Sequence, residues 1–212
     1  MNKSINIAVV GLGQVGSYLL NELNTKKKDI ELKTGKKINV VAISARNINK
    51  KRQFKINKKI FFKNPLDIFS KTNIDILFEA IGLSDGISKK VIETALKKKI
   101  HVITPNKALI SKHGNELAKI AELNNVNLEF EASVAGGIPI LRSIKEGLAT
   151  NKISKVYGIL NGTSNYILSE MENSNQSFSD VLKKAQKLGY AEPGNPKLDL
   201  NGFDAFAKVR IL

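Results

Sequence analysis

Apolar residues in the first 130 or so positions fall into short runs, separated by stretches in which apolar and polar residues recur with a helical period. Strands are predicted at 5–10, 38–43, 74–78, 101–104 and 126–130, and helices at 17–24, 87–96 and 114–123. The basic segment 47–63 is predicted to be a loop with one short strand. Strands alternating with helices form a mostly parallel sheet with helices on both faces, so the predicted fold class is α/β.

The pattern changes near Ala132, where the glycine-rich stretch SVAGGIP follows. Pro139 suits the first turn of a helix that runs to about Leu148. Beyond it the sequence predicts a strand at 155–160, a polar turn at 161–165, and helices at 166–172, at 178–188 and after Gly202. We therefore expect two domains, 1–131 and 132–212, the second being the beginning of an α+β domain that is truncated.

The formal net charge of +15 raises the question of a nucleic-acid partner. Thirty of the 34 basic residues are lysines, whereas base and phosphate recognition favours arginine, and aromatic residues make up only 6% of the chain. We expect no nucleic-acid partner. No apolar stretch approaches the roughly 18 residues that cross a bilayer, so we expect no membrane partner. The absence of cysteine and of a cleavable leader predicts a cytoplasmic location.

The run Gly11-Leu12-Gly13-Gln14-Val15-Gly16 fits the dinucleotide-binding pattern G-x-G-x-x-G. The first glycine allows a tight turn, the second lets the backbone approach a pyrophosphate, and the third lets the helix pack closely on the strand. The motif alone is weak, because any glycine-rich turn can produce it. Here it follows the first predicted strand and opens the first helix, which favours a Rossmann-type NAD(P)-binding domain.

The end of the second predicted strand bears on the choice of cofactor. NAD-preferring sites place an acidic residue there to bind the ribose hydroxyls. This chain has Ser44-Ala45-Arg46 instead, with Lys50, Lys51 and Arg52 just beyond. A guanidinium near the adenosine ribose suits a 2′-phosphate, so we predict NADP(H) in preference to NAD(H). The alternative is that Arg46 is a solvated loop residue.

Two further segments offer polar groups at predicted strand ends. Lys107 follows the predicted strand at 101–104, at the edge of the sheet where ligands collect. The segment 161–165 (NGTSN) could hold a carboxylate or an amide at a helix N-terminus, or Thr163 or Ser164 could simply cap that helix. The turn at 131–139 could offer carbonyls to a monovalent cation, although such turns usually only reverse the chain. We interpret His101 and His113 as structural.

The segment from 188 to 208 gathers Glu192, Asp199, Asp204 and Lys208. Prolines and glycines predict a loop in its first half and a helix after Gly202. Asp204 and Lys208 are four residues apart and therefore share one helix face, where a carboxylate can position an ammonium group. An exposed ion pair is the alternative, but the apolar run AFAKVRIL predicts a buried helix.

Taken together, these motifs resemble the homoserine dehydrogenase family from Ile5 to Leu212. The resemblance rests on GLGQVG, TPNKALI, EASVAGGIPI, YGILNGTSNYIL and the LGYAE…NGFDAFAK segment. It implies reversible NAD(P)-linked interconversion of L-homoserine and L-aspartate 4-semialdehyde, on the route to threonine and methionine. It also implies a homodimer for the complete family member.

The resemblance assigns roles residue by residue. It implies nucleotide binding at Gly11, Gly13, Gln14, Val15 and Gly16, with Arg46, Ser84, Lys107 and Gly189 as further cofactor contacts. Substrate would contact Glu192, Asp199, Asp204 and Thr163, and the catalytic set would be Lys208, Lys107 and Asp204. Backbone carbonyls of Glu131, Val134, Gly136 and Ile138 correspond to the sodium site of the family.

The implied chemistry needs a proton donor besides a hydride carrier, and a chain without cysteine has few candidates. Two lysines converging in a partly dry cleft would lower the pKa of each other, and Lys107 and Lys208 supply that pair. Three departures from the family pattern stand out. Seven positions separate Glu192 from Asp199 where six are usual, and Asn195 stands where an aspartate usually precedes the loop proline. Members of the family also continue for roughly a hundred further residues. The alternative function is a nucleotide-binding fragment without turnover.

Overall fold

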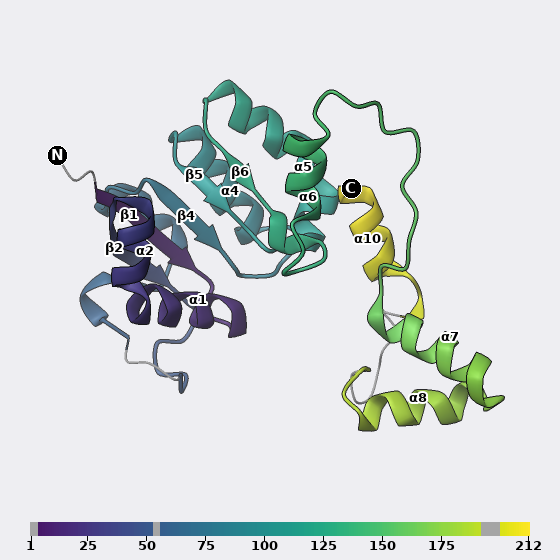
Figure 1. Ribbon diagram of the computed structural model, residues 1–212. Helices are drawn as coiled ribbons and strands as arrows, with labels where there is room; N and C mark the ends of the chain where they lie inside the picture. Colours follow the sequence, from purple (N-terminus) through teal and green to yellow (C-terminus); the bar gives the residue numbers. More distant parts are fainter. Residues whose placement is uncertain (1–3, 53–55, 192–199) are drawn as a thin grey trace. The chain divides into compact units, whose positions relative to one another are not determined.

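The computed structural model describes residues 4–52, 56–191 and 200–212, which form two compact units, Met1–Gly137 and Ile138–Leu212 (Figure 1). The predicted boundary at 131/132 lies six residues before the boundary between these units at 137/138. Each unit has its own buried side chains, so each is described separately below.

A six-stranded parallel sheet forms the centre of the first unit, in the order β3-β2-β1-β4-β5-β6. Its strands are β1 (Ser4–Val10), β2 (Lys37–Ser44), β3 (Phe61–Phe62), β4 (Ile76–Glu79), β5 (His101–Ile103) and β6 (Leu128–Glu129). The order reverses its direction between β1 and β4, which makes this the point where a ligand crevice is expected. The predicted Rossmann-type α/β fold is confirmed.

Helices connect the strands. They are α1 (Gln14–Thr25), α2 (Lys27–Thr34), α3 (Ile68–Lys71), α4 (Ile87–Lys97) and α5 (Lys107–Leu123), with 3-10 turns at Lys58–Ile60, Pro65–Asp67 and Glu131–Ser133. The predicted start of the last helix at 114 is wrong, because α5 begins at Lys107. The Asn106 side chain accepts a hydrogen bond from the backbone N–H of Leu109 and caps the helix there.

Along β4, β5 and β6 the side chains on one face of the sheet are more deeply buried than those on the other face. Leu77, Glu79, Val102 and Leu128 are buried, and α4 contacts β4 and β5 on this side. The intervening residues are half-buried or exposed, as at Ile103. Strands β1 and β2 share an apolar cluster with helix α1. This cluster consists of Ile7, Val9, Leu12, Leu20 and Ile43.

The second unit is helical in its described part. It contains α6 (Ile140–Arg142), a π-helical turn at Ser143–Gly147, α7 (Gly162–Ser174), α8 (Phe178–Lys187) and α10 (Phe203–Ile211). Its core is small, since α7 and α8 pack through Ile167, Val181, Ala185 and Ala191. The predicted helices at 166–172, at 178–188 and after Gly202 are confirmed within a few residues. The helix expected from Pro139 is present as α6 and the π turn, and Pro139 itself is the N-cap.

The predicted strand at 155–160 is wrong. Residues 152–159 are exposed and have no regular secondary structure, and none of the described residues pairs with the segment 152–160 in a ladder. Val156, Tyr157 and Ile159 gave this segment the apolar content of a strand, and all three are exposed. A strand needs a partner for its backbone N–H and C=O groups, which sequence pattern does not supply.

The predicted burial of the last helix is also wrong. Phe203 and Phe206 of α10 are 61% and 62% exposed, and no residue of this helix is fully buried. The Asp204 and Lys208 side chains are better covered, at 14% and 21% exposed. The helix therefore shields its ion pair and exposes its aromatic rings.

Candidate cofactor and substrate site

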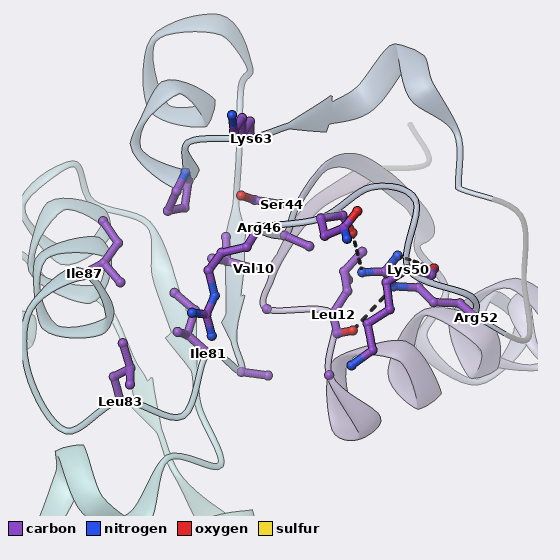
Figure 2. A pocket seen from close by; sticks show the side chains of 16 residues that line it. Val10, Leu12, Ser44, Arg46, Lys50, Arg52, Lys63, Ile81, Leu83 and Ile87 are labelled. Carbon is purple, nitrogen blue, oxygen red and sulfur yellow. Dashed lines mark hydrogen bonds between the residues drawn. The ribbon is translucent and has the colours of Figure 1, made fainter.

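A pocket of about 500 Å³ opens at the carboxyl ends of β1, β2 and β4 in the first unit (Figure 2). Val10 and the glycine turn form its floor, the loops after β2 and β3 form one rim, and Ile81, Leu83 and Ile87 form an apolar wall. This is the edge of a parallel sheet, at the reversal of strand order, where dinucleotides bind. Of the predicted cofactor contacts, Gly11, Gly13 and Arg46 line this pocket.

The glycine turn has the geometry that its motif predicts. Gly11 has a φ of +92°, and a Cβ there would lie 2.3 Å from the backbone carbonyl of Ala80. A Cβ on Gly16 would lie 1.9 Å from the carbonyl oxygen of Gly11. Gly13 differs, because a Cβ there would meet no atom within 4 Å. The outer glycines are thus required by the fold, and the middle one leaves open space beside the pocket.

The N-terminus of α1 suits an anion. Gly13 is its N-cap and provides no side-chain acceptor, and no acidic residue lies in its first turn. The first N–H groups of a helix have no partner within the helix, so they attract phosphate oxygens. Gln14 and Val15 supply two of these groups. Residues present at this turn therefore fit a pyrophosphate.

Four basic residues line the pocket, and none of the described lining residues is acidic. They are Arg46, Lys50, Arg52 and Lys63. Figure 2 shows Arg46 extending from the end of β2 into the pocket toward Ile81, whereas Arg52 turns toward Leu12. The cationic rim on the β2–β3 side and the apolar wall beyond β4 give the pocket two chemically different ends.

Glu79 at the end of β4 is a residue that the sequence analysis did not single out. It is completely buried, and its carboxylate accepts hydrogen bonds from the Thr104 hydroxyl at 2.7 Å and from the Ile81 N–H at 2.9 Å. Thr104 in turn accepts from the N–H of Asn106, and the Asn106 amide donates to the Leu83 carbonyl at 2.9 Å. This buried network joins the apolar wall of the pocket to the start of α5. The sequence did contain a signal for Glu79, since it is a charged residue at the end of an otherwise apolar strand.

Lys107 is the first residue of α5, directly after the capping Asn106, and it is half-buried. Ser84 does not line the pocket, and its hydroxyl donates to Asp85. Hydrogen bonds from Lys112, His113 and Ser84 hold the pKa of the exposed Asp85 carboxyl well below its usual range. These contacts connect the loop after β4 with α5.

Both histidines have structural contacts, in line with the interpretation from sequence. The His113 ring lies 2.8 Å from Asp85, and His101 accepts a hydrogen bond from the N–H of Asn127 at 3.0 Å. Within residues 4–52, 56–191 and 200–212, no group of three or more His, Cys, Asp or Glu side chains could hold a metal ion. No helix in that same part of the chain is long and apolar enough to cross a membrane.

A polar cluster in the second unit contains the predicted Asp204–Lys208 pair. The Lys208 ammonium lies 2.7 Å from the Asp204 carboxylate and donates to the Leu160 carbonyl at 2.6 Å. The Asn161 side-chain amide donates to the same Asp204 oxygen at 3.1 Å. The cluster therefore joins α10 to the end of the extended segment and the start of α7. An ammonium has three N–H donors, and two have these partners.

The helix cap of α7 differs from the two candidates taken from the sequence. Asn161, rather than Thr163 or Ser164, is the N-cap, and its side chain accepts from the Ser164 N–H at 2.8 Å. The Thr163 hydroxyl donates to the Tyr190 carbonyl at 2.6 Å, so this buried residue connects α7 to the turn after α8. Asn161 thus contacts both the cap and Asp204.

The remaining predicted residues lie elsewhere. Glu192 and Asp199 fall outside the described residues. Gly189 lies in the turn after α8 with a φ of +80°. Glu131, Val134 and Gly136 lie at the end of the first unit, where the Glu131 carbonyl accepts from the Val134 N–H, and the Ile138 carbonyl accepts from the Ile140 N–H at 2.8 Å.

Two family models match the chain. The model described as homoserine dehydrogenase, NAD binding domain, matches residues 11–131, and the model described as homoserine dehydrogenase matches residues 139–212. A homoserine dehydrogenase of Neisseria gonorrhoeae is 40% identical over 210 residues, which is 99% of this chain and 48% of that protein.

Solved structures agree with the sequence matches. The homoserine dehydrogenase of S. aureus at pH 8.5 has a TM-score of 0.86 and 39% identity over 100% of this chain and 49% of that one. A hyperthermophilic archaeal homoserine dehydrogenase in complex with NADPH shares the fold, with a TM-score of 0.78 and 24% identity over 98% of this chain and 68% of that one. The chain spans about half the length of the curated relatives it matches. With both family models matched in order along a nucleotide-binding unit and a second helical unit, the chain belongs to the homoserine dehydrogenase family.

Proposed function

We propose that this chain carries out the NADP(H)-linked interconversion of L-homoserine and L-aspartate 4-semialdehyde, a step toward threonine and methionine. The observation that carries the proposal is the Asp204–Lys208 pair, which shares a family-matched chain with a glycine turn built for a dinucleotide. A bound nicotinamide would take up or supply the hydride. The side chains of this protein would bind the substrate, exclude water and handle the proton.

Lys208 is the proposed acid/base residue. In the oxidation direction the hydroxyl-bearing carbon of homoserine loses a hydride, and the hydroxyl oxygen loses a proton that the neutral amine of Lys208 would accept. In the reduction direction the ammonium of Lys208 returns that proton to the developing alkoxide. Asp204 and the Leu160 carbonyl support this role, because they fix the nitrogen by two short contacts in a partly covered position.

The other proposed contacts follow from the family resemblance. Glu192 and Asp199 would bind the α-ammonium group of the substrate, with Asp204 and Thr163 beside them. Lys107 and Gly189 would contact the cofactor near its nicotinamide, and Ser84 is a further proposed contact. The half-buried position of Lys107 at the start of α5 supports its part, because Glu79, Thr104 and Asn106 hold this helix end against the apolar wall of the pocket.

The preference for NADP(H) rests on the rim of the pocket. Arg46 and Lys63 are available for a 2′-phosphate, and the residue at the end of β2 that would bind ribose hydroxyls in an NAD site is not acidic. Replacing Arg46 with alanine should weaken NADPH binding about tenfold or more and leave NADH binding nearly unchanged, since a charged hydrogen bond is lost for one ligand only. Tighter binding of NADH than of NADPH by the unmodified protein would overturn the preference.

We further propose that carbonyls of Glu131, Val134, Gly136 and Ile138 hold a sodium ion. Oxygen ligands suit hard cations, and a carbonyl oxygen that accepts one hydrogen bond keeps a second lone pair. Positive φ angles at Ala135 and Gly137 support a tight turn there. Exchanging sodium for choline at constant ionic strength should lower the Tm of the protein. An unchanged Tm would oppose the proposed ion.

The decisive experiment follows homoserine-dependent NADPH formation by absorbance. In a form of the protein that turns over, Lys208→Ala should lower kcat at least about 100-fold, the usual scale for loss of a general acid or base. Lys183→Ala is the matched control, because Lys183 is an exposed lysine of the same unit on α8. A loss below tenfold in Lys208→Ala would move the role to Lys107.

The assay also separates the two functions that the sequence left open. The 212-residue chain should bind NADPH whether or not it turns over, because the pocket is formed within the first unit. NADPH binding measured by fluorescence without homoserine-dependent turnover would favour a nucleotide-binding unit. Failure to bind NADPH or NADH at all would reject both the dehydrogenase function and the nucleotide-binding function.

A further inference from the structure

Arg52 lines the pocket, yet its guanidinium is occupied by the protein itself. Its Nε donates to the Leu12 carbonyl at 3.4 Å, and its two terminal nitrogens donate to the carbonyls of Lys50 at 2.9 Å, Asn47 at 3.0 Å and Ile48 at 3.3 Å. Four of the five N–H donors of the guanidinium thus have backbone partners. Figure 2 shows the Nε side of the Arg52 guanidinium toward Leu12, away from the tip of Arg46.

These partners belong to two separate loops. Asn47, Ile48 and Lys50 follow β2 in the loop that carries Arg46, and Leu12 lies in the glycine turn between β1 and α1. Leu12 is also fixed from its other side, because its carbonyl accepts a hydrogen bond from the Ser17 hydroxyl of α1. Arg52 therefore joins the irregular loop after β2 to the glycine turn.

We propose that Arg52 is a positioning residue for cofactor selection, which holds the 46–50 loop against the glycine turn so that Arg46 meets the 2′-phosphate of NADP(H). This inference rests on the proposed preference for NADP(H). The loop has no regular secondary structure, so ordering it on ligand binding would cost conformational entropy. Backbone carbonyls bonded to one planar guanidinium remove that cost before the ligand arrives.

The geometry distinguishes this role from direct contact with phosphate. An arginine that recognises a phosphate directs its donor fork at the ligand, usually by two parallel bonds. The fork of Arg52 is directed at carbonyl oxygens on both sides of it. Lysine keeps the positive charge but has a single nitrogen with three donors, which cannot reach four carbonyls spread over two loops.

The test compares two ligands that lack the nicotinamide and differ only in the 2′-phosphate, namely 2′,5′-ADP and 5′-AMP. Their dissociation constants are measured by titration calorimetry on the 212-residue chain. The ratio of the two constants cancels everything that the ligands share, including any loss of folded protein. The variants are Arg46→Ala, Arg52→Ala, Arg52→Lys and the double variant, and Lys58→Ala is a control that removes an exposed cation of the same connection between β2 and β3.

The unmodified protein should prefer 2′,5′-ADP by about tenfold or more, and Arg46→Ala should abolish most of that preference. Arg52→Ala and Arg52→Lys should both reduce the ratio to a similar extent, and Lys58→Ala should leave it unchanged. Since Arg52 acts through Arg46, replacing Arg52 in the Arg46→Ala background should reduce the ratio little further.

Each contrary result has its own meaning. Equal affinity of the unmodified protein for both ligands rejects the NADP(H) preference and the inference together. A normal ratio in Arg52→Lys means that charge alone is needed, which overturns the positioning role. Additive losses in the double variant mean that Arg52 contacts the 2′-phosphate itself, which also overturns it. A normal ratio in Arg52→Ala, with Arg46→Ala impaired, rejects the inference and leaves the proposed function standing.

Discussion

The sheet of the first unit and helix α10 of the second differ in which side chains they cover. In the first unit Leu77, Val102 and their neighbours are buried between the sheet and its helices, and Arg46 is exposed at the rim of the pocket. In the second unit Phe203 and Phe206 are exposed, and the Asp204–Lys208 pair is the shielded part of α10. The first unit has a broad apolar core, whereas the described part of the second has a four-residue apolar cluster and a few polar contacts.

The largest effect is expected from a substitution in the glycine turn. Gly11→Ala places a Cβ 2.3 Å from the backbone of Ala80 at a φ of +92°, and should lower the free energy of unfolding of the first unit by about 3 kcal/mol or more. Chemical denaturation of the first unit, followed by fluorescence of an introduced probe, measures this change.

Gly13→Ala is the matched control in the same turn. Nothing lies within 4 Å of the added methyl group, so stability should change by less than about 1 kcal/mol while NADPH affinity falls, because the methyl group blocks the approach of the pyrophosphate. Equal loss of stability in the two variants would show that the turn is held less tightly than the backbone contacts indicate.

Hydrogen exchange tests the comparison directly. Amides of β1 and β4, which lie inside the sheet, should exchange roughly 100-fold more slowly than amides of α7 and α8, because the second unit has the smaller core. Mass spectrometry of peptides from each element gives the rates. Equal protection in both units would mean that the chain unfolds as one cooperative body and that the difference in core size has no energetic weight.

A smaller loss is expected for Glu79→Gln. Both partners of this buried carboxylate are donors, so the NH₂ group of a glutamine would face either the Ile81 N–H or the Thr104 hydroxyl and leave one donor unpaired. The expected loss of stability is about 1–3 kcal/mol, measured by denaturant unfolding. The exposed Glu122→Gln is the control and should be neutral. A neutral Glu79→Gln would place water or another acceptor beside residue 79.

The smallest effect concerns the exposed cluster around Asp85. The pKa of this carboxyl is lowered by hydrogen bonds from Lys112, His113 and Ser84. Its ionised form therefore stabilises the folded state above the unfolded pKa of about 3.9, and the contribution is lost as the pH falls from there through the folded pKa.

The Tm difference between the unmodified protein and Asp85→Asn should accordingly be small, and it should shrink as the pH falls below 4. Solvent screening keeps it small, and 1 M NaCl should reduce it further. Thermal scans across this pH range provide the measurement. A difference that grows as the pH falls below 4 would contradict the assigned contacts.

Local sequence features predicted much of the first unit. Strands β1 and β2 and helix α4 follow from apolar period alone, and the Gly11 and Gly16 positions follow from the limits on backbone approach in a tight turn. The four-residue spacing of Asp204 and Lys208 predicted a pair, and the structure has it at 2.7 Å. Each of these depends on residues that are neighbours in the chain or within one element.

The predictions that the structure contradicts depend on contacts between distant residues. The apolar segment 155–160 is not a strand, since a strand requires a ladder partner from elsewhere in the chain. The Glu79 network joining β4 to β5 required the ends of separate strands to be brought together. The early start of α5 is the exception, because the Asn106 cap is local and bonds Leu109 three residues ahead. Arg52 likewise shows its role only through carbonyls on two loops.

By itself the sequence determined the alternation of strands and helices, the glycine turn and the family, because periodicity, backbone freedom and motif spacing are properties of short stretches of chain. Tertiary structure decided which basic side chains of the loop after β2 extend into the pocket and which bond to backbone carbonyls. It also decided which side of α10 is shielded. These depend on the positions of backbone carbonyls and packing partners tens of residues away, and side-chain hydrogen bonds are satisfied only where the fold brings such groups within about 3 Å.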